Sequence, residues 1–483
     1  MAWEFWIDRG GTFTDIVAKD PEGNIETHKL LSENPEHYKD AAVQAISNTL
    51  GHVAIDQADI SVVKMGTTVA TNALLERKGV SVLLMITEGF GDLLKIGYQN
   101  RPDLFSTRIK RPEPLYKTVV EVSERLNAEG QALIPLDLER ARFDMWMARE
   151  NGVKSIAIAL LHAYLNPEHE RQLAALAREL GFEQISTSHE VSGLSKLVSR
   201  GDTTVVDAYL SPVLRRYVDQ VADALSLGKN CKALMFMQSN GGLIDAQKFQ
   251  GKDAILSGPA GGIVGMVETG QQAGFNLLIG FDMGGTSTDV SHFAGKLERS
   301  FETDVAGVRL RAPMMDIHTV AAGGGSVCSY RDGRFQVGPD SAGAAPGPAS
   351  YRRGGPLTVT DCNLVLGSLS PNYFPAVFGT SGNMPLDNEA AKQRIKELAS
   401  KYDLHGSIED IAMGFLEIAV QNMANAIKKI SVERGHNITS YTLQSFGGAG
   451  GQHACLVAEE LGMSRVMIHP FACLLYTSPS PRD

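Results

Sequence analysis

The sequence predicts an α/β protein made of two similar halves, and three observations support this fold class. A short motif occurs twice, as DRGGTFTD at residues 8–15 and as DMGGTSTD at residues 282–289, which is 282 − 8 = 274 positions later. Each copy opens a run of strand-like segments, after which helix-like and strand-like segments alternate. The chain has 483 residues, which is more than one ordinary core holds, so we expect at least two domains.

The composition is that of a globular protein and argues against two classes of function. Hydrophobic residues make up 43% and charged residues 21% of the chain. A formal net charge of −10 without a stripe of Lys or Arg argues against nucleic-acid binding. The five cysteines form no CxxC pair, the N-terminus lacks a signal-peptide pattern, and the longest apolar run is too short for a bilayer. We therefore expect a cytosolic protein with reduced thiols and no membrane contact.

The first half predicts alternating strands and helices. In order, it predicts an antiparallel three-stranded meander, a helix and two strand-turn-helix units, at residues 4–30, 38–50, 60–79 and 80–94. The segment 107–140 breaks this alternation and predicts an insertion that contains a hairpin turning at residues 127–130. A strand and a helix then restore the alternation, and a long helix at residues 203–225 leads into the second half.

The second half begins the plan again. It predicts a strand and turn, a glycine-containing helix, a second meander, a Gly/Pro-rich loop, a long helix and a strand-turn-helix, at residues 232–244, 260–274, 276–301, 338–357, 408–435 and 441–462. We therefore place a first domain at residues 1–202 and a second at residues 203–472.

The repeated motif predicts a phosphate-binding turn. A strand–Gly-Gly-Thr–strand hairpin can direct backbone N–H groups and a Thr hydroxyl at one anion, since only Gly lets a phosphate approach the chain so closely. One such hairpin can be a turn and nothing more, but two that face each other across a cleft would clamp a triphosphate. The predicted phosphate-binding residues are Gly10, Gly11, Thr12, Gly284, Gly285 and Thr286.

The aspartates that precede the turns predict a metal site. A carboxylate would repel phosphate, so Asp8 and Asp282 are expected to hold Mg²⁺, which bridges phosphate oxygens. The predicted ligands are therefore ATP and Mg²⁺. Asp15 and Asp289 either close the hairpins or take part in catalysis, and the sequence leaves both roles open.

A third glycine-rich segment completes the predicted nucleotide site. Residues 445–455 read SFGGAGGQHAC, in which a double Gly-Gly loop follows a strand and enters a helix. Alone, such a loop is usually a packing device, but beside two phosphate turns it predicts the nucleoside site. Its predicted binding residues are Gly447, Gly448, Gly450 and Gly451. No Walker sequence is present, and no GxGxxG follows an early strand, so P-loop and Rossmann interpretations are weak.

These three segments, in this order, resemble the actin-like ATPase superfamily. The resemblance implies two actin-like (ribonuclease H-like) ATPase domains with a nucleotide cleft between them. Longer motifs resemble the hydantoinase/oxoprolinase family, of the hydantoinase A type, and most closely its ATP-dependent oxoprolinase members. They include MGTTVATNALLERKG, QSNGGL, SGPAGGIVG, DIHTVAAGGGS, GPDSAGAAPGPASYRRGG and GGAGGQHAC, and they cover about residues 4–472.

The resemblance implies a reaction. Such proteins use ATP to open the lactam 5-oxo-L-proline to L-glutamate, with release of ADP and phosphate. Phosphorylation of the lactam oxygen would make a poor electrophile reactive, and the site would supply positioning and charge neutralisation. The alternatives are an ATP-dependent hydantoinase, a related carboxylase subunit, and a non-catalytic binding module that a nucleotide switches.

Several other residues have two interpretations each. The predicted catalytic residues are Asp8, Asp282, Thr12, Thr286 and Arg101. Arg101, in the segment NRPDLF, and Arg9 are candidates for the substrate carboxylate, although an Arg before Pro is more often a loop anchor. Asp316 and His318 are candidates for a base or metal pair, with a structural histidine favoured. His453 and Cys455 lack two further ligands at zinc spacing.

The end of the sequence departs from the family pattern. After residue 472 the last eleven residues, CLLYTSPSPRD, have no helix or strand period. We expect residues 473–483 to be a foreign tail and the second domain to be truncated. The resemblance implies a hydantoinase B-type region as partner, either fused or as a subunit, and we also expect a homodimer.

Overall fold

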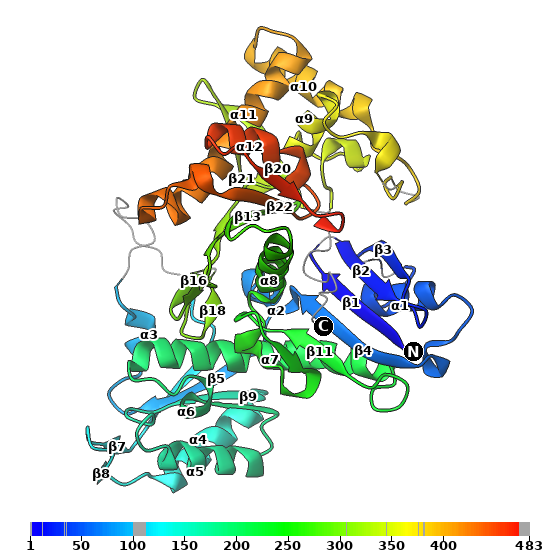
Figure 1. Cartoon of the computed structure of the whole chain (residues 1–483). Helices are drawn as coiled ribbons and strands as arrows, with labels where there is room; N and C mark the ends of the chain where they lie inside the picture. The colour runs from blue at the N-terminus through cyan, green and yellow to red at the C-terminus, as the bar shows by residue number, and fades with distance from the viewer. Residues whose placement is uncertain are drawn as a thin grey trace.

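The computed structural model describes residues 2–11, 13–32, 34, 36–99, 113–305, 307–343, 345–374, 376–379 and 382–472. The predictions for Thr12, Arg101 and the tail 473–483 lie outside these residues. Figure 1 shows an upper lobe formed by the C-terminal half and a lower lobe formed mostly by the N-terminal half. None of the described helices combines the length and the apolar character that crossing a membrane requires.

The first motif lies in a six-stranded sheet of order β12-β11-β4-β1-β2-β3. Its strands are β1 (Trp3–Arg9), β2 (Phe13–Lys19), β3 (Ile25–Leu31), β4 (Ile60–Thr67), β11 (Leu234–Met237) and β12 (Leu243–Asp245). The antiparallel pairing of β1 with β2 and of β2 with β3 confirms the predicted first meander. Parallel β4 lies on the other side of β1. Two helices belong to this part of the chain: α1 (Ala41–Leu50), between β3 and β4, and α2 (Val69–Leu75), which follows β4.

A second sheet, of order β10-β9-β5-β6, is entirely parallel. Its strands are β5 (Val82–Thr87), β6 (Thr118–Val122), β9 (Ser155–Ala159) and β10 (Gln184–Thr187). The surrounding helices are α3 (Leu93–Ile96), α4 (Leu138–Glu150), α5 (Glu168–Glu179), α6 (Ser188–Val191) and α7 (Leu197–Ala224). The predicted hairpin is confirmed as β7 (Arg125–Leu126) and β8 (Ala132–Ile134). The segment 107–140 is nevertheless more than an insertion, because it supplies β6.

The second motif lies in a five-stranded sheet of order β19-β14-β13-β22-β23. Its strands are β13 (Leu277–Met283), β14 (Thr288–Ala294), β19 (His318–Val320), β22 (Thr442–Phe446) and β23 (Val466–Ile468). The second meander was predicted within residues 276–301, but the strand that pairs with β14 in this sheet is β19, which lies beyond that range. Three short two-stranded sheets are formed by β15 (Arg299–Ser300) with β18 (Met314–Met315), β16 (Thr303–Val305) with β17 (Val308–Leu310), and β20 (Ser326–Arg331) with β21 (Arg334–Ser341).

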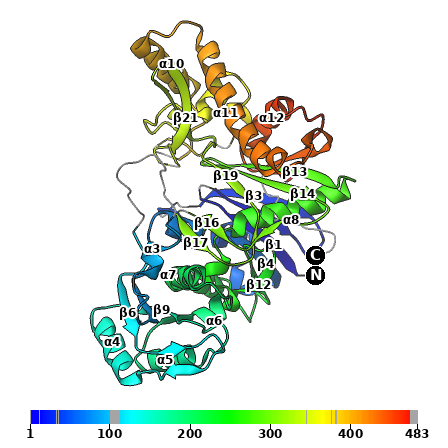
Figure 2. The ribbon, with the colours of Figure 1, turned by 90° about the vertical axis from the view of Figure 1, so that its left-hand side faces the viewer.

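The helices of the C-terminal half are α8 (Ser257–Gln272), α9 (Val359–Val365), α10 (Asn388–Tyr402), α11 (Ile408–Ile430) and α12 (Ala454–Glu460). Helix α11 begins with a capping box. Ser407 Oγ accepts a hydrogen bond from Asp410 N at 3.0 Å, and Asp410 Oδ2 accepts one from Ser407 N at 2.9 Å. Its apolar face, which includes Phe415 and Met423, is fully buried in the core of the upper lobe. Helix α8 contacts both β4 and β13 and lies between the lobes in both views (Figures 1 and 2).

The two motif-bearing sheets share one arrangement. In each, the motif joins two antiparallel strands, and a parallel strand lies against the first of them: β4 against β1, and β22 against β13. The boundary expected at residue 203 falls inside α7, a continuous helix of 28 residues. After this helix the chain returns to the first sheet as β11 and β12. Residues 234–245 therefore belong to the first sheet, not to the second.

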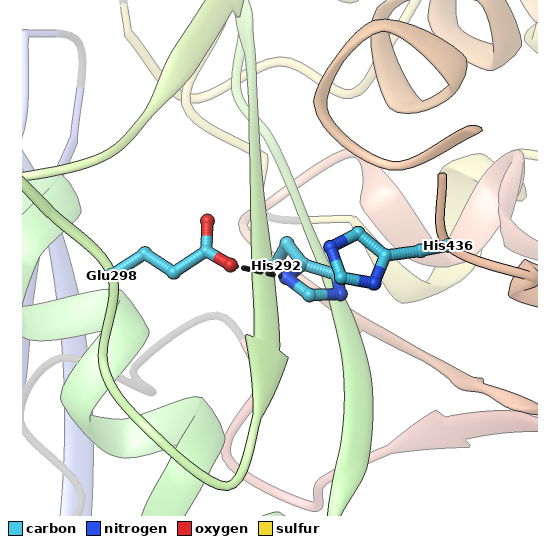
Figure 3. A group of neighbouring side chains, drawn as sticks. All are labelled: His292, Glu298 and His436. Atoms are coloured by element: carbon cyan, nitrogen blue, oxygen red, sulfur yellow. Dashed lines mark hydrogen bonds and ion pairs between the residues drawn. The ribbon is translucent and has the colours of Figure 1, made fainter. Parts of the chain in front are cut away.

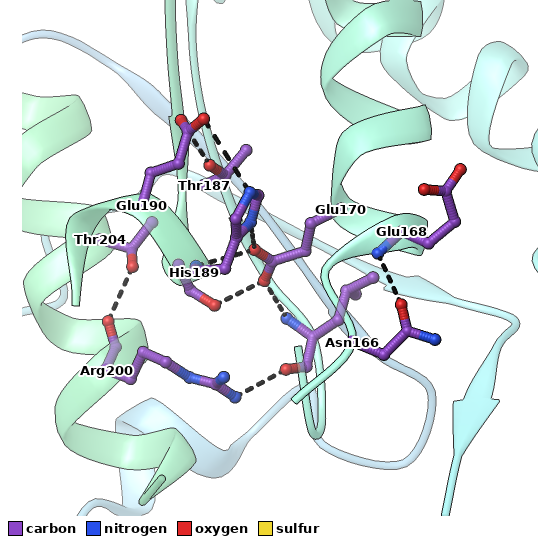
Figure 4. A network of polar contacts seen from close by, with 10 residues as sticks. Asn166, Glu168, Glu170, Thr187, His189, Glu190, Arg200 and Thr204 are labelled. Carbon is purple, nitrogen blue, oxygen red and sulfur yellow. Dashed lines mark hydrogen bonds and ion pairs between the residues drawn. The ribbon is translucent and has the colours of Figure 1, made fainter. Parts of the chain in front are cut away.

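A buried polar network fixes the end of the parallel sheet (Figure 4). Glu170 is fully buried and accepts hydrogen bonds from Leu160 N at 2.9 Å, Ser188 Oγ at 2.5 Å and His189 N at 3.0 Å. Its carboxylate also contacts His189 Nδ1 at 2.6 Å. Arg200, 1% exposed, donates from Nη2 to the carbonyl of Leu160 at 2.7 Å. The network thus joins β9, α5, α6 and α7.

We expect Glu170→Gln to lower the free energy of unfolding by about 1–3 kcal/mol, because the amide presents donors where the carboxylate only accepted. The matched control is Glu168→Gln, two residues earlier and exposed, with an expected effect within about 0.5 kcal/mol. Urea unfolding followed by circular dichroism measures both variants. Equal effects would contradict a stabilising role for the network.

Candidate functional site

The two Gly-Gly hairpins have the same backbone geometry. Gly10 N–H donates to the carbonyl of Phe13 at 3.1 Å, and Gly284 N–H donates to the carbonyl of Ser287 at 3.0 Å. In both, the two aspartates of the motif lie opposite each other in the strand pair, Asp8 with Asp15 and Asp282 with Asp289. The repeated sequence therefore folds into a repeated turn.

The two preceding carboxylates are buried at the ends of β1 and β13. Asp8 is 8% and Asp282 is 7% exposed. Burial, and secondly the charge of Asp15, raise the pKa of Asp8 to about 7, although the charge of Lys29 opposes this shift. Burial also raises the pKa of Asp282 well above its ordinary value, with further contributions from Asp289 and from Asp8. Each lobe thus contributes one buried carboxylate, and the negative charge of Asp8 contributes to the raised pKa of Asp282.

This pair fits a bound cation. Asp8 Oδ1 is buried without a hydrogen-bond partner among the described residues. Two glycines, Gly66 and Gly258, lie beside that oxygen, because an added Cβ on them would lie 3.3 or 3.7 Å from it. A larger side chain at either position would take space next to the carboxylate. Helix α8 begins here, and Ser257 Oγ accepts a hydrogen bond from Thr67 N at 3.2 Å. Hard divalent cations such as Mg²⁺ prefer carboxylate oxygens of this kind.

The tips of the hairpins fit an anion. Gly11, Gly285 and Thr286 are exposed, and their backbone N–H groups have no acceptor among the described residues. Successive free N–H groups in a turn are a common phosphate-binding element. In each lobe, a buried carboxylate of the kind that binds cations therefore adjoins a turn of the kind that binds anions.

A run of three glycines supports the second hairpin from behind. Gly324 N–H donates to the carbonyl of Gly284 at 3.1 Å, and Gly325 N–H donates to that of Gly285 at 2.6 Å. A Cβ at Gly323 would lie 2.7 Å from the backbone of the hairpin. In the sequence, these glycines were noted only within the motif DIHTVAAGGGS, which resembles the family. Three consecutive glycines are themselves a sequence signal for two backbone segments that pack this closely.

The glycine loop after β22 lies against the second hairpin. Ala449 N–H donates to the carbonyl of Met283 at 2.9 Å. Gly447 has a φ of +78°, and a Cβ there would overlap the Asp282 carboxylate. Of the predicted nucleoside residues, Gly447 thus lies next to Asp282, and Gly450 lies near the backbone of Phe281 and Met283. The contact of Gly447, Gly448, Gly450 and Gly451 with a nucleotide stays a prediction.

His453 and Cys455 take no part in a described metal site. His453 is fully buried, its Nε2 lies 3.0 Å from Asn363 Nδ2, and burial lowers its pKa to about 4. Cys455 is exposed. The histidine is therefore neutral and serves packing beneath the glycine loop.

The second aspartates of the motifs have different partners. Asp15 forms an ion pair with Lys29 at 2.6 Å, whereas Asp289 accepts a hydrogen bond from Thr319 Oγ1 at 2.5 Å. Burial raises the pKa of Asp289 to about 6. Lys29 stands directly opposite Asp15 in the β2–β3 pair. The first hairpin is therefore partly neutralised by a lysine, and the second is not.

The raised pKa of Asp8 predicts a pH-dependent affinity for cations. Below about pH 7 Asp8 holds a proton that Mg²⁺ must displace, so we expect the Mg²⁺ affinity to fall as pH falls, approaching tenfold per pH unit. Calorimetric titration with ADP present, at about pH 6 and about pH 8, measures this. Asp15→Asn should move the midpoint to lower pH, because the charge of Asp15 raises the pKa of Asp8. A pH-independent affinity would contradict this assignment.

The other predicted residues are engaged elsewhere or not described. Arg9 lies 3.7 Å from Asp40 and stacks over the ring of Tyr217, so this guanidinium already has an anionic partner. Asp316 forms an ion pair with Arg434 at 2.7 Å. The pKa of His318 is lowered, mainly by burial. These contacts favour structural roles for Arg9, Asp316 and His318.

A cavity of about 580 Å³ lies between α3, α7 and the β16–β17 hairpin. Apolar side chains such as Leu94 and Leu115 line it together with the ion pair between Asp202 and Arg309, at 3.2 Å. Burial raises the pKa of Asp202 to about 7, although Arg309 opposes this shift. The walls of this cavity come from segments far apart in the chain, so no local sequence pattern indicates it.

Two protein-family models match the chain. The one described as hydantoinase/oxoprolinase N-terminal region matches residues 4–181, and the one described as hydantoinase/oxoprolinase matches residues 200–478.

Curated proteins from eukaryotes and bacteria are similar to the chain. It is 43% identical to a 5-oxoprolinase of Saccharomyces cerevisiae and 42% identical to 5-oxoprolinase 1 of Arabidopsis thaliana, over 97% and 98% of this chain. It spans about 40% of the length of each of these two relatives. It is also 35% identical to caprolactamase subunit alpha of Pseudomonas jessenii, over 96% of this chain and 67% of that protein.

Two solved structures have the same fold. The ATP-dependent caprolactamase from Pseudomonas jessenii matches with a TM-score of 0.81 and 33% identity, over 99% of this chain and 70% of that chain. A nucleotide-free acetone carboxylase matches with a TM-score of 0.81 and 26% identity, over 98% of this chain and 69% of that chain. These similarities confirm the predicted α/β fold class.

Proposed function

Because the chain belongs to the hydantoinase/oxoprolinase family, we propose that it is the ATP-using part of an ATP-dependent lactam hydrolase of the 5-oxoprolinase type. The observation that carries this proposal is the pair of equivalent hairpins, each with a buried aspartate and free backbone N–H groups, one from each lobe. The similarity to 5-oxoprolinases over nearly the whole chain supports the choice of acceptor.

The proposed reaction begins with phosphorylation of the lactam. The carbonyl oxygen of 5-oxo-L-proline attacks the γ-phosphorus of ATP, the bond to the β,γ-bridging oxygen breaks and ADP leaves. Water then adds to the activated carbon, the ring C–N bond breaks, and a second water releases phosphate from the acyl phosphate. The products are L-glutamate, ADP and phosphate. Phosphoryl transfer depends mainly on positioning and charge neutralisation, which is what two opposed phosphate turns provide.

Each part of the site has a proposed role. Asp8 and Asp282 would hold Mg²⁺, which neutralises charge on the polyphosphate. The N–H groups of Gly11, Gly285 and Thr286 would bind phosphate oxygens. Gly10 and Gly284, whose N–H groups close the hairpins, would let phosphate approach the backbone closely. The loop containing Gly447, Gly448, Gly450 and Gly451 would bind the nucleoside side. Thr12 and Arg101 are proposed from the sequence motif alone.

The hydrolytic steps require a second component. The eukaryotic relatives are about two and a half times as long as this chain, and the Pseudomonas jessenii relative is by its name an alpha subunit. We propose that a hydantoinase B-type region, fused or separate, captures the phosphorylated lactam, and that the chain dimerises.

The buried free thiols of Cys231, Cys328 and Cys362 support a cytosolic location.

The test is ATP hydrolysis by the chain, combined with a hydantoinase B-type region, in the presence of 5-oxo-L-proline, hydantoin or no acceptor. Stimulation by 5-oxo-L-proline alone would support the proposal, and stimulation by hydantoin alone would favour a hydantoinase. Equal rates with all three would overturn it and favour a nucleotide-switched binding module. Glu168→Gln, at an exposed residue outside the site, serves as the control for variants of the site.

A further inference from the structure

Two histidines and a glutamate meet in the upper lobe, on segments that the proposed function does not use. His292 lies on β14, Glu298 follows that strand in the turn before β15, and His436 follows α11 (Figure 3). One ligand atom from each of the three residues lies within 4.8 Å of the other two. Two of these ligand atoms are in direct contact, since His292 Nδ1 is 2.7 Å from Glu298 Oε1.

The outer atoms of the same side chains are held by other residues. His292 Nε2 lies 3.0 Å from Tyr441 Oη, which leaves Nδ1 for a ligand. Glu298 Oε2 accepts a hydrogen bond from Arg434 at 3.2 Å, which leaves Oε1. Asp316 in turn neutralises Arg434 at 2.7 Å. Metal-binding histidines and carboxylates are usually oriented by such outer hydrogen bonds.

The side chains of the group differ in how deeply they are buried. The His292 side chain is 1% exposed, whereas that of Glu298 is 32% exposed. The rings of His292 and His436 stack with their centroids 4.1 Å apart and their planes at 29°. One ligand is therefore rigid and buried, while the glutamate side opens to solvent, through which an ion could enter and keep a water ligand.

We propose that His292, Glu298 and His436 bind one divalent transition-metal ion, with Zn²⁺ favoured and water completing the coordination. Two imidazole nitrogens and one carboxylate oxygen suit zinc, whereas Mg²⁺ prefers oxygen ligands. In a tetrahedral zinc site the ligand atoms lie about 3.3 Å apart. Binding would therefore widen the 2.7 Å contact between His292 Nδ1 and Glu298 Oε1 and bring the ligand atom of His436 nearer to both.

The ion would connect two segments that lead to the nucleotide site. Strand β14 leaves the second Gly-Gly turn, and residues 431–441 join α11 to β22, which ends at the glycine loop. Metal binding would thus link the strand that leaves the second Gly-Gly hairpin to the segment that leads into β22, the strand before the glycine loop. The consequence is a zinc-dependent stability of the upper lobe, which does not depend on which acceptor the protein uses.

The test is metal binding by the untagged chain. Cys455 is exposed and Cys473 is a second thiol, so both are changed to Ser to exclude thiolate ligands. Titration with Co²⁺, followed by visible absorption, and competition with Zn²⁺ should show one ion per chain. We expect His436→Gln to abolish binding and Tyr441→Phe to weaken it about tenfold. His405→Gln, at an exposed histidine outside the group, should leave it unchanged.

Thermal unfolding separates loss of the site from loss of the fold. Zinc should raise the Tm of the parent chain and of His405→Gln but not that of His436→Gln. If His436→Gln does not fold, Glu298→Gln replaces it, since the amide oxygen can still accept from Arg434. The proposal is overturned if the parent chain binds no stoichiometric ion, or if a folded His436→Gln or Glu298→Gln binds it equally well.

Discussion

Asp282→Asn is expected to weaken Mg²⁺-dependent nucleotide binding by at least about 100-fold. Asp282 is the buried carboxylate at the end of β13, where the second hairpin, the glycine loop and the charge of Asp8 meet. An amide keeps the shape of the side chain but removes the charge that would bind the cation. Calorimetric titration of ADP, with and without Mg²⁺, measures the loss.

The same substitution should make the chain more stable when divalent cations are absent. Burial and the neighbouring aspartates raise the pKa of Asp282, so the folded state binds a proton more tightly than the unfolded state does. Stability therefore falls as pH rises from the unfolded pKa, near 4, through the raised folded pKa. Above that range the folded state carries the cost of a buried charge. We expect Asp282→Asn to recover on the order of 1 kcal/mol at about pH 8.

A second buried aspartate serves as the control for both effects. Asp207 is 2% exposed, but it accepts hydrogen bonds from Ser186 Oγ at 2.7 Å and Ser211 Oγ at 3.1 Å. Asp207→Asn should cost about 1 kcal/mol and leave Mg²⁺-dependent binding unchanged. If Asp282→Asn instead destabilises the chain and retains affinity, Asp282 is a structural residue and not a metal ligand.

The parts of the site that the sequence predicted are those set by local pattern. The two hairpins follow from the repeated Gly-Gly motif, because the turn needs only the residues within it, as the matching bonds of Gly10 and Gly284 show. The position of Lys29 opposite Asp15 also follows from the meander, once its register is known. No local pattern indicates that the two hairpins differ in charge.

The parts that were missed depend on contacts between distant segments. Strand β14 pairs with β19 and meets the segment 296–301 only at an isolated bridge between Phe293 and Leu297, because Arg299 and Ser300 pair as β15 with β18. Likewise β11 returns to the first sheet after α7 and lies parallel to β4. Local periodicity shows that a segment is a strand but not which edge it joins. The support of the second hairpin by Gly323, Gly324 and Gly325 was missed for the same reason.

Gly447→Ala is expected to damage both stability and nucleotide binding. The residue has a φ of +78°, where an L side chain is strained by about 1–2 kcal/mol. Its Cβ would also overlap the Asp282 carboxylate and lie 2.6 Å from the carbonyl oxygen of Met283. We expect a total loss of about 3 kcal/mol in the free energy of unfolding, and displacement of Asp282 from its position. Chemical unfolding and ADP titration measure the two effects.

Gly448→Ala is the matched control, because it separates the packing of the loop from its contact with a ligand. A Cβ at Gly448 would meet no described atom within 4 Å, so the stability should change by no more than about 0.5 kcal/mol. The same open space is where the nucleoside is proposed to lie, so the added methyl group should weaken ADP binding about tenfold. Unchanged affinity in a stable Gly448→Ala would remove this glycine from the nucleoside site. Unchanged affinity in Gly447→Ala as well would show that the loop packs against the second hairpin without serving the nucleotide.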